Sequence, residues 1–269
     1  MSRNIFLHEL RIRRKSVLVW SLATAALIGF FFSIFPSFAE QAELTQELLK
    51  KFPPELLAAF GMNQLDMAAI SGFFAFLFIF VQLCLAIQAG NYGFGLISIE
   101  ENERTADFLL TRPVSRAQVL TSKLLAAFVS LTITNLVIWA VSFAAIEAFR
   151  GERTYDAGVV LLLLASIAIF QLLFLAIGVL VSVLVKRIRS VTPYSLGLGF
   201  GMYTLSAFSG VFGDIKLEYI TPFKHFDTAY IIQNRAFNTP FLLADVAIIG
   251  MCIALTYVLY IRRDIHAVS

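Results

Sequence analysis

The 269-residue chain is 59% hydrophobic and 14% charged, with a mean hydropathy of +0.81. Soluble proteins carry about 45–50% apolar and about 25% charged residues, so these values exclude an ordinary soluble fold and favour a protein of the lipid bilayer. The net charge of +3 is small, and the basic residues lie in loops rather than in one stripe, which argues against nucleic acid as a partner.

Six apolar segments are long enough to cross a bilayer, because a helical span needs about 20 apolar residues. They predict an all-α polytopic membrane protein with a single transmembrane domain over residues 1–269 and spans at about 17–39, 68–92, 118–146, 157–185, 191–212 and 240–261. Thr192-Pro193 and Thr239-Pro240 predict two helix starts, each with a threonine N-cap before a proline at the first helical position.

Residues 2–14 combine apolar side chains with arginines, a pattern that predicts an amphipathic helix lying in the membrane interface. A plain basic flank to the first span is the alternative. The first span ends in Ser37-Phe38-Ala39, which resembles a signal-peptide cleavage site, but its length of about 22 residues exceeds the usual 7–15. We therefore expect the first span to be retained.

Most of the 21 lysines and arginines precede the first span, lie in the second–third and fourth–fifth connections, or follow the last span. Short cytoplasmic loops are enriched in basic residues, so this side is predicted to be cytoplasmic and to hold both termini. We expect a multi-pass protein of a cell membrane, namely the plasma membrane of a bacterium. On the opposite side, the polar stretch 40–67 predicts one short amphipathic helix and a turn.

Motifs for enzyme chemistry are missing from the sequence. It has no His-Glu-x-x-His, Gly-x-Ser-x-Gly or Cys-x-x-Cys motif, so we predict no catalytic residues, no metal ligands and no enzyme. It has no Gly-x-x-x-x-Gly-Lys-Ser/Thr loop, so ATP is not expected to bind this chain. The acidic residues Glu147 and Asp245 fall near the outer ends of spans, where we expect solvated or interfacial carboxylates.

Neutral polar residues and glycines are the other notable groups in the spans. Interhelical hydrogen bonding explains buried amides in lipid, with a substrate-facing role as the alternative, and the amides are Gln82, Gln88, Asn135 and Gln171. Gly197 and Gly201 are four residues apart on one helix face, with Gly199 between them, which permits close approach of another helix. That helix belongs either to this chain or to a second subunit.

The connection between the second and third spans predicts a short cytoplasmic helix over 98–112. Ser98 and Glu101 have the spacing of a capping box, and acidic residues occupy the first turn, where the helix dipole favours them. Pro113 ends this helix, and Ser115 with Gln118 repeats the capping box at the start of the third span. A solvated connecting loop is the alternative.

This stretch resembles the signature of ABC-2 type transporter permeases, in which an acidic cluster, Gly-Thr, a leucine, Pro-Val-Ser-Arg and a lysine follow the second span. The corresponding residues here are Glu101, Glu103, Thr105, Leu109 or Leu110, Pro113, Val114, Ser115, Arg116 and Lys123. Arg104 stands where the family has glycine. Chain length, span number and the N-terminal helix extend the resemblance over nearly the whole sequence.

The resemblance implies a permease that pairs with a second permease, as a homodimer or heterodimer within the membrane lipid. A separate nucleotide-binding ATPase holds ATP and Mg²⁺, and this chain binds no cofactor. The helix over 98–112 is then the coupling helix that contacts the ATPase, through Glu100, Glu101, Glu103, Arg104, Thr105, Phe108, Leu109, Leu110, Pro113 and Arg116.

The further resemblance to type V exporters implies re-entrant helices over about 213–239, for which interfacial anchoring by aromatic side chains is the alternative. It also implies export, and a pathway lined by aromatic, aliphatic and amide side chains suits an amphiphilic substrate such as a peptide, lipid or drug. The alternative function is an ATPase-independent secondary transporter or channel, which needs an ionisable site near the middle of the bilayer.

Overall fold

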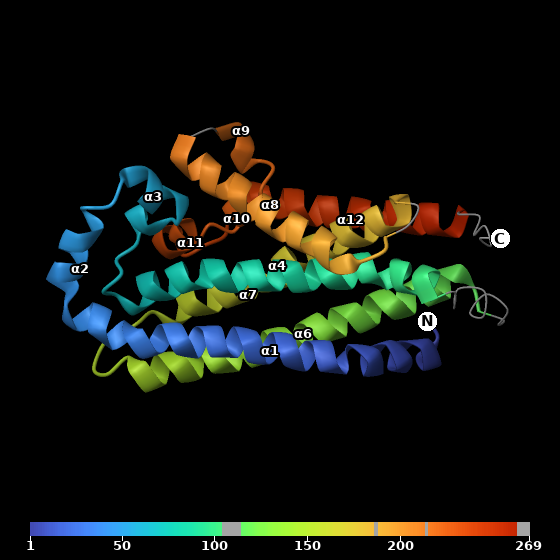
Figure 1. Ribbon diagram of the computed structural model, residues 1–269, viewed down its shortest axis with the longest axis horizontal. Helices are drawn as coiled ribbons and strands as arrows, with labels where there is room; N and C mark the ends of the chain where they lie inside the picture. Colours follow the sequence, from blue (N-terminus) through green and yellow to red (C-terminus); the bar gives the residue numbers. More distant parts are fainter. Residues whose placement is uncertain (104–113, 186–187, 213–214, 263–269) are drawn as a thin grey trace.

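The computed structural model describes residues 1–103, 114–185, 188–212 and 215–262, and every regular element within these ranges is a helix (Figure 1). The long helices are α1 (Arg3–Glu40), α4 (Ile70–Glu103), α6 (Arg116–Phe149), α7 (Ala157–Leu184), α8 (Val191–Phe212) and α12 (Thr239–Arg262). The short ones are α2 (Ala42–Leu49), α3 (Pro54–Ala59), the 3₁₀ turn η1 (Met62–Gln64), α9 (Ile215–Glu218), α10 (Pro222–His225) and α11 (Thr228–Asn234). The long helices run along the long axis of the molecule, and the short ones gather at the end opposite the N-terminus.

Within the described residues, five helices are long and apolar enough to cross a bilayer, namely α1, α4, α6, α7 and α12. They correspond to five of the six predicted spans. The sixth predicted span, 191–212, is helical as α8 but is not among the five, and its sequence is rich in glycine, serine and threonine. The count of six spans is therefore not confirmed by length and apolarity alone.

The helix α1 is continuous through the boundary predicted near residue 15, so the expectation of a separate interfacial helix over 2–14 was wrong. The reason is that one buried stripe runs through that boundary at helical spacing, with Glu9, Arg13, Val17, Ser21, Thr24 and Ile28 on it. The Ser2 backbone N–H donates a 2.8 Å hydrogen bond to Ser122 Oγ, which holds the start of α1 against α6. A helix of 38 residues is about 57 Å long, so α1 extends well beyond a hydrocarbon core of about 30 Å.

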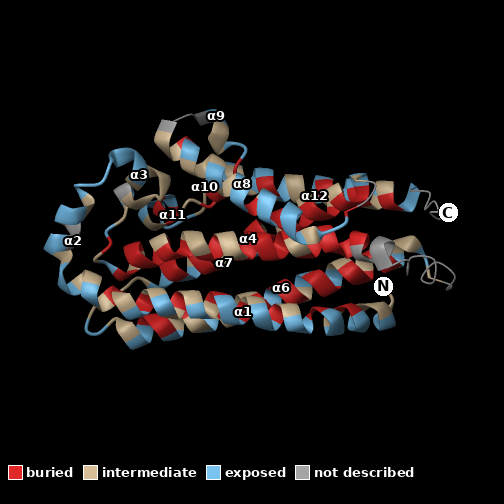
Figure 2. Ribbon diagram, viewed as in Figure 1, coloured by how far each residue is buried: buried red, intermediate tan, exposed pale blue. Residues whose placement is uncertain are grey.

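The central pair of the bundle is α4 and α7, with α1 and α6 on one side and α8 and α12 on the other (Figure 2). In their most apolar stretches, 67% of α4 and 61% of α7 are buried, against 17% of α12. Glycines bring the two central backbones together, because a Cβ atom on Gly93 would lie 2.6 Å from the Leu175 carbonyl oxygen and 3.0 Å from Gly178 Cα. No larger residue fits at Gly93 without moving a backbone.

The predicted helix starts are close to the observed ones. Ser115 and Gln118 form the predicted capping box at the start of α6, with both hydrogen bonds at 3.2 Å. Helices α12 and α8 begin one and two residues before Pro240 and Pro193, so the preceding threonines lie in the first turn and the prediction of threonine N-caps was wrong. A proline in the first turn still removes no helical hydrogen bond, because those N–H groups have no partner within the helix.

The segment between α8 and α12 folds back against the central pair. The Phe223 ring of α10 lies 5.1 Å from Phe170 and 6.1 Å from Phe174, near the middle of α7. Gln82 of α4 donates a 3.3 Å hydrogen bond to the Phe226 carbonyl oxygen, and Phe226 is 1% exposed. On the other connection, residues 40–67 hold two short helices and a 3₁₀ turn where one short helix was predicted.

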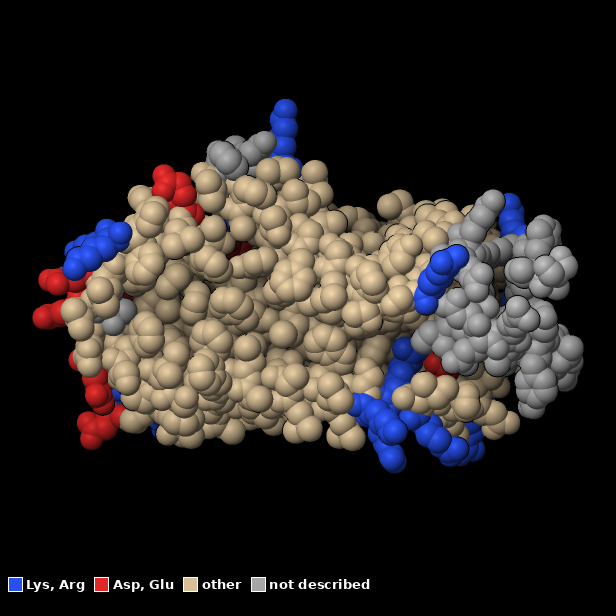
Figure 3. Space-filling model, viewed as in Figure 1, with Lys and Arg blue, Asp and Glu red and all other residues tan. Residues whose placement is uncertain are grey.

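Charged side chains concentrate at the two ends of the molecule, as the face in Figure 3 shows. Lysines and arginines gather at the end where α1 begins and α12 ends, while most acidic residues on that face lie at the opposite end. A broad uncharged band separates the two, as expected for the part of a bundle that lies in hydrocarbon.

Replacing Gly93 by alanine tests the close contact between α4 and α7. The added methyl group clashes with the α7 backbone, so we expect a loss of about 1–3 kcal/mol and a melting temperature in detergent about 2–10 °C lower. Gly29→Ala is the control, because a Cβ atom there meets nothing within 4 Å and alanine is the better helix former. Equal melting temperatures for the two variants would contradict the tight contact.

Candidate functional site

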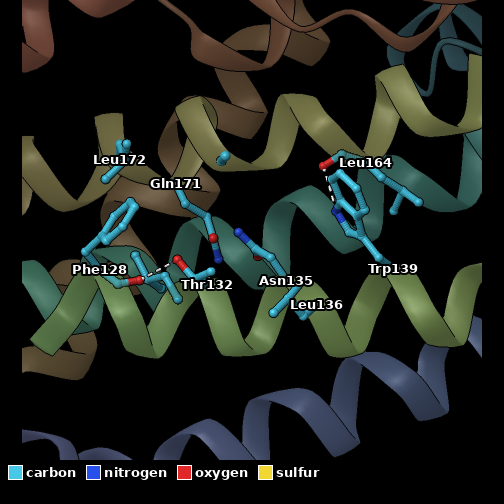
Figure 4. A pocket seen from close by; sticks show the side chains of 10 residues that line it. Phe128, Thr132, Asn135, Leu136, Trp139, Leu164, Gln171 and Leu172 are labelled. Carbon is cyan, nitrogen blue, oxygen red and sulfur yellow. Dashed lines mark hydrogen bonds between the residues drawn. The ribbon is translucent and has the colours of Figure 1, made fainter.

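A cavity of about 220 Å³ lies between α6 and α7 and brings together two of the predicted amide residues. Asn135 comes from α6 and Gln171 from α7, and their side chains point toward one another (Figure 4). The remaining walls are largely apolar and include Phe128, Trp139 and Leu172. The cavity opens on the surface of the bundle, where the lining residue Leu136 is 62% exposed.

A chain of hydrogen bonds leads from Gln171 into the centre of the bundle. Gln171 Nε2 donates to Gln88 Oε1 of α4 at 3.4 Å. Gln88 Nε2 in turn donates to Thr134 Oγ1 at 2.9 Å and to the Tyr92 hydroxyl at 3.4 Å. The Tyr92 hydroxyl donates to Ser16 Oγ of α1 at 3.2 Å, so four helices share one buried polar path. Such hydrogen bonds replace the water that lipid excludes.

The path ends beside a charged cluster at the basic end of the molecule, formed by Glu9, Arg13 and Lys123. The Arg13 guanidinium donates to Glu9 at 2.8 Å and lies 5.2 Å from the centre of the Tyr92 ring. Lys123 Nζ lies 3.5 Å from the Glu9 carboxylate and donates a 2.7 Å hydrogen bond to the Leu96 carbonyl oxygen of α4. All three charged residues are buried, so the cluster joins α1, α4 and α6 inside the bundle.

The predicted coupling residues are placed only in part. The helix α4 continues through Ser98 to Glu103, and Ser98 Oγ donates to the Phe94 carbonyl oxygen at 2.6 Å, so the expected helix start at Ser98 was wrong. For three predicted residues only the backbone is described; they are Glu100, Glu101 and Glu103. Six others lie wholly outside the described residues; they are Arg104, Thr105, Phe108, Leu109, Leu110 and Pro113. Arg116 begins α6 and donates to the Ile261 carbonyl oxygen of α12 at 3.3 Å.

The two predicted packing glycines do not make an internal contact. A Cβ atom on Gly197 or Gly201 would meet nothing within 4 Å, whereas one on Gly199 would lie 2.8 Å from Ile87 Cγ1 of α4. The packed face of α8 is therefore that of Gly199. Gly197 and Gly201 lie on the exposed face, which leaves the second-subunit alternative open.

A buried histidine–aspartate pair is the site that the sequence reasoning missed. His225 Nδ1 of α10 lies 2.8 Å from Asp245 Oδ1 of α12, and the side chains are 3% and 0% exposed. The imidazole stacks on Phe241 at a centroid distance of 4.6 Å. The expectation of a solvated or interfacial Asp245 was wrong, because the chain that folds back after α8 covers it. The signal for it was weak, since a lone histidine in a connection carries no spacing to an acid twenty residues later.

The described residues contain no group of three histidine, cysteine or acidic side chains that could hold a metal ion. Chemically, the site consists of a mainly apolar cavity with amide groups, a buried polar path, the charged cluster of Glu9, Arg13 and Lys123, and the buried His225–Asp245 pair.

Comparison with known proteins gives a family match over nearly the whole chain. The family described as ABC-2 family transporter protein matches residues 3–265. Among curated individual proteins, none matches this sequence.

Leucine substitutions of His225 and Asp245, singly and together, test whether the pair acts as a unit. Each single change leaves a buried polar group without its partner, so we expect each to cost about 3–5 kcal/mol of stability. The double variant should lose less than the sum of the two, as measured by thermal unfolding in detergent. The exposed Glu147–Arg150 pair is the control, because Glu147→Leu should cost less than about 1 kcal/mol. Additive losses at His225 and Asp245 would show that the two side chains are not coupled.

Proposed function

The chain belongs to the ABC-2 transporter family, and from this we propose that it is the membrane-spanning permease subunit of an ATP-driven exporter. Two permeases pair in the membrane, and a separate ATPase subunit binds each of them on the cytoplasmic side. The ATPase holds ATP and Mg²⁺, and this chain supplies the path for an amphiphilic substrate. The match to the family over residues 3–265 is the observation that carries the proposal.

The charge distribution supports the orientation we propose. The end rich in lysine and arginine, where α1 begins and α12 ends, faces the cytoplasm and the ATPase (Figure 3). Both termini then lie in the cytoplasm of a cell whose plasma membrane holds the protein. In this arrangement α8 is the sixth span, since its 22 residues extend about 33 Å, enough to cross the hydrocarbon core.

Coupling to the ATPase starts at the connection that follows α4. We propose that residues 98–112 contact the ATPase, with the last turn of α4 as their beginning. Movement of this connection displaces the cytoplasmic ends of α4 and α6. Lys123 links these helices to α1, through Leu96 and Glu9, so the three helices move together.

The segment over 213–239 closes the opposite end of the path as a re-entrant element. Its support is the contact of α10 with the middle of α7, together with the Gln82 hydrogen bond that satisfies the Phe226 carbonyl oxygen. Backbone at membrane depth must be buried in protein in this way. The His225–Asp245 pair fastens the same segment to α12.

The exposed face of α8 is the seam we propose for the second permease, a second copy or a related chain. Gly197 and Gly201 leave room there for the backbone of another helix.

An ATPase-independent secondary transporter or channel is the second candidate, and one observation favours it. The buried His225–Asp245 pair is an ionisable site within the bundle, of the kind that ion-coupled transport requires. Proteoliposomes that contain this chain alone distinguish the two functions. Solute movement driven by a proton or sodium gradient without ATPase would replace the exporter proposal.

Capture of the ATPase is the first test of the exporter. The chain is co-expressed with the candidate ATPase subunit and purified in detergent, as wild type and as the double variant Glu101→Lys, Leu109→Asp. We expect the wild type to retain the ATPase and the variant to lose at least 90% of it, because the charge reversal at Glu101 and the apolar-to-charged change at Leu109 both oppose docking. Glu55→Lys with Leu56→Asp is the matched control, since these exposed residues of α3 lie at the opposite end. Equal capture by both double variants would contradict the coupling site.

Lys123→Met tests transmission separately from docking. The methionine keeps the length of the side chain but removes the charge beside Glu9 and the hydrogen bond to Leu96. We expect unchanged ATPase capture and a reduction of about tenfold or more in ATP-dependent export from proteoliposomes. Arg150→Met is the control, because this arginine pairs with Glu147 at the exposed end of α6, outside the cluster and the fold-back segment. Normal export by the Lys123 variant would show that the cluster does not transmit the movement.

A further inference from the structure

We propose that the cavity between α6 and α7 binds amphiphiles whose polar group donates hydrogen bonds, with a primary ammonium group on an apolar body as the preferred form. This inference rests on the proposed transport function and names the class of substrate. It comes from the unpaired polar atoms of the residues that line the cavity, among which acceptors exceed donors.

The hydrogen-bond chain behind the cavity determines which end of the Gln171 amide faces it. The Ser130 carbonyl oxygen can only accept, so the Thr134 hydroxyl, 3.3 Å away, donates to it. Thr134 Oγ1 therefore accepts from Gln88, which must present its NH₂ group there and its Oε1 atom toward Gln171. Gln171 then presents its own NH₂ group to Gln88, and this leaves Gln171 Oε1 buried with no hydrogen-bond partner in the cavity wall.

The other polar groups of the wall add further acceptors. Asn135 Oδ1 is also buried without a partner. The Thr132 hydroxyl donates to the Phe128 carbonyl oxygen at 2.9 Å, so its oxygen can only accept from a ligand. Trp139 Nε1 donates to the Leu164 carbonyl oxygen at 3.1 Å and is not available as a donor. The Asn135 NH₂ group is the donor that remains, against three acceptor oxygens.

This arrangement selects for a donor. A buried acceptor without a partner costs free energy, and a ligand N–H group recovers that cost. The aromatic rings of Phe128 and Trp139 on the same wall attract a cation through their π faces. None of the described residues that line the cavity is charged, so a carboxylate finds no cation among them and meets two carbonyl oxygens instead.

The size and opening of the cavity define the rest of the ligand. A volume of about 220 Å³ is below the usual range of about 300–1,000 Å³ for sites that enclose a whole drug-sized molecule. The cavity therefore holds the polar group and one ring or short chain. The remaining apolar part leaves past the exposed side chains of Phe128 and Leu136, toward lipid.

Fluorescence quenching in lipid nanodiscs tests the proposal directly. The chain has two tryptophans, so Trp20→Phe leaves Trp139 in the cavity wall as the single reporter. Three probes share a bromophenyl body that quenches on contact: 4-bromophenethylammonium, its N,N,N-trimethyl form, and the matching carboxylate. We expect saturable quenching by the primary ammonium, at least about tenfold weaker binding of the trimethyl form, which has no N–H group, and no saturable quenching by the carboxylate.

Gln171→Leu in the same background should abolish the preference for the primary ammonium, and Asn135→Leu should reduce it. Gln82→Leu is the matched control, because Gln82 is equally buried at 1% exposure but does not line the cavity. Asn135→Leu leaves the Gln88–Gln171 hydrogen bond intact and so keeps the test decisive if Gln171→Leu does not fold.

Equal affinity for the primary and trimethyl forms, or the same preference in the Gln171 and Gln82 variants, would overturn the proposal. Binding is measured without ATPase, so this failure differs from a failure of the exporter itself, which shows as lost ATPase capture. A wild type that captures ATPase but shows no donor preference is an exporter with a different substrate class.

Discussion

The contact between α4 and α7 is the constraint on which the packing of α8, α10 and α12 depends. Lipid chains are as apolar as leucine, so helices in a bilayer are not driven together by the hydrophobic effect and are held by close packing and polar contacts. Gly93 and Gly178 let these two backbones touch, and the Gln88–Gln171 hydrogen bond joins the same two helices. The helix α8 then packs on α4, and α10 packs on the middle of α7. A shift of the central pair would separate all these surfaces at once.

The cavity and the charged cluster are connected through this pair. The cavity lies on one flank of α7, and the charged cluster of Glu9, Arg13 and Lys123 joins the basic ends of α1, α4 and α6. Between them, hydrogen bonds run from Gln171 through Gln88 and Tyr92 to Ser16, and the Arg13 guanidinium of the cluster lies 5.2 Å from the centre of the Tyr92 ring. In the exporter that we propose, such a path links closure of the ATPase to the state of the cavity by displacing few, well-defined contacts.

The long helices could be predicted from the sequence because bilayer thickness sets the length of an apolar segment, and α7 agrees with its prediction to within one residue. Local cues failed at three places. The capping-box spacing at Ser98 is present, yet α4 continues to Glu103, and the Ser98 hydroxyl donates to the Phe94 carbonyl oxygen one turn back. The amphipathic pattern of 2–14 is real, with Arg3, Arg11 and Arg14 exposed, but the stripe that carries Glu9 and Arg13 is buried in the bundle and continues into the first span. The burial of Asp245 could not be predicted from its position near the start of α12, because the residue that covers it, His225 of α10, lies twenty residues earlier in the sequence. The amides of the cavity were identified from their residue type in apolar segments, but which atoms face the cavity depends on three neighbouring helices.

The partners of α1 have a consequence for synthesis in the membrane. Its main neighbour is α6, which the ribosome completes only after α2, α3 and α4. At about 5–20 residues per second, α1 stays in the bilayer for several seconds before Lys123 is made. During that interval the Glu9 carboxylate already has a partner one turn away, the Arg13 guanidinium at 2.8 Å. The Glu9–Arg13 pair compensates the charges of these two side chains until α6 is inserted. Lys123 of α6 then completes the cluster.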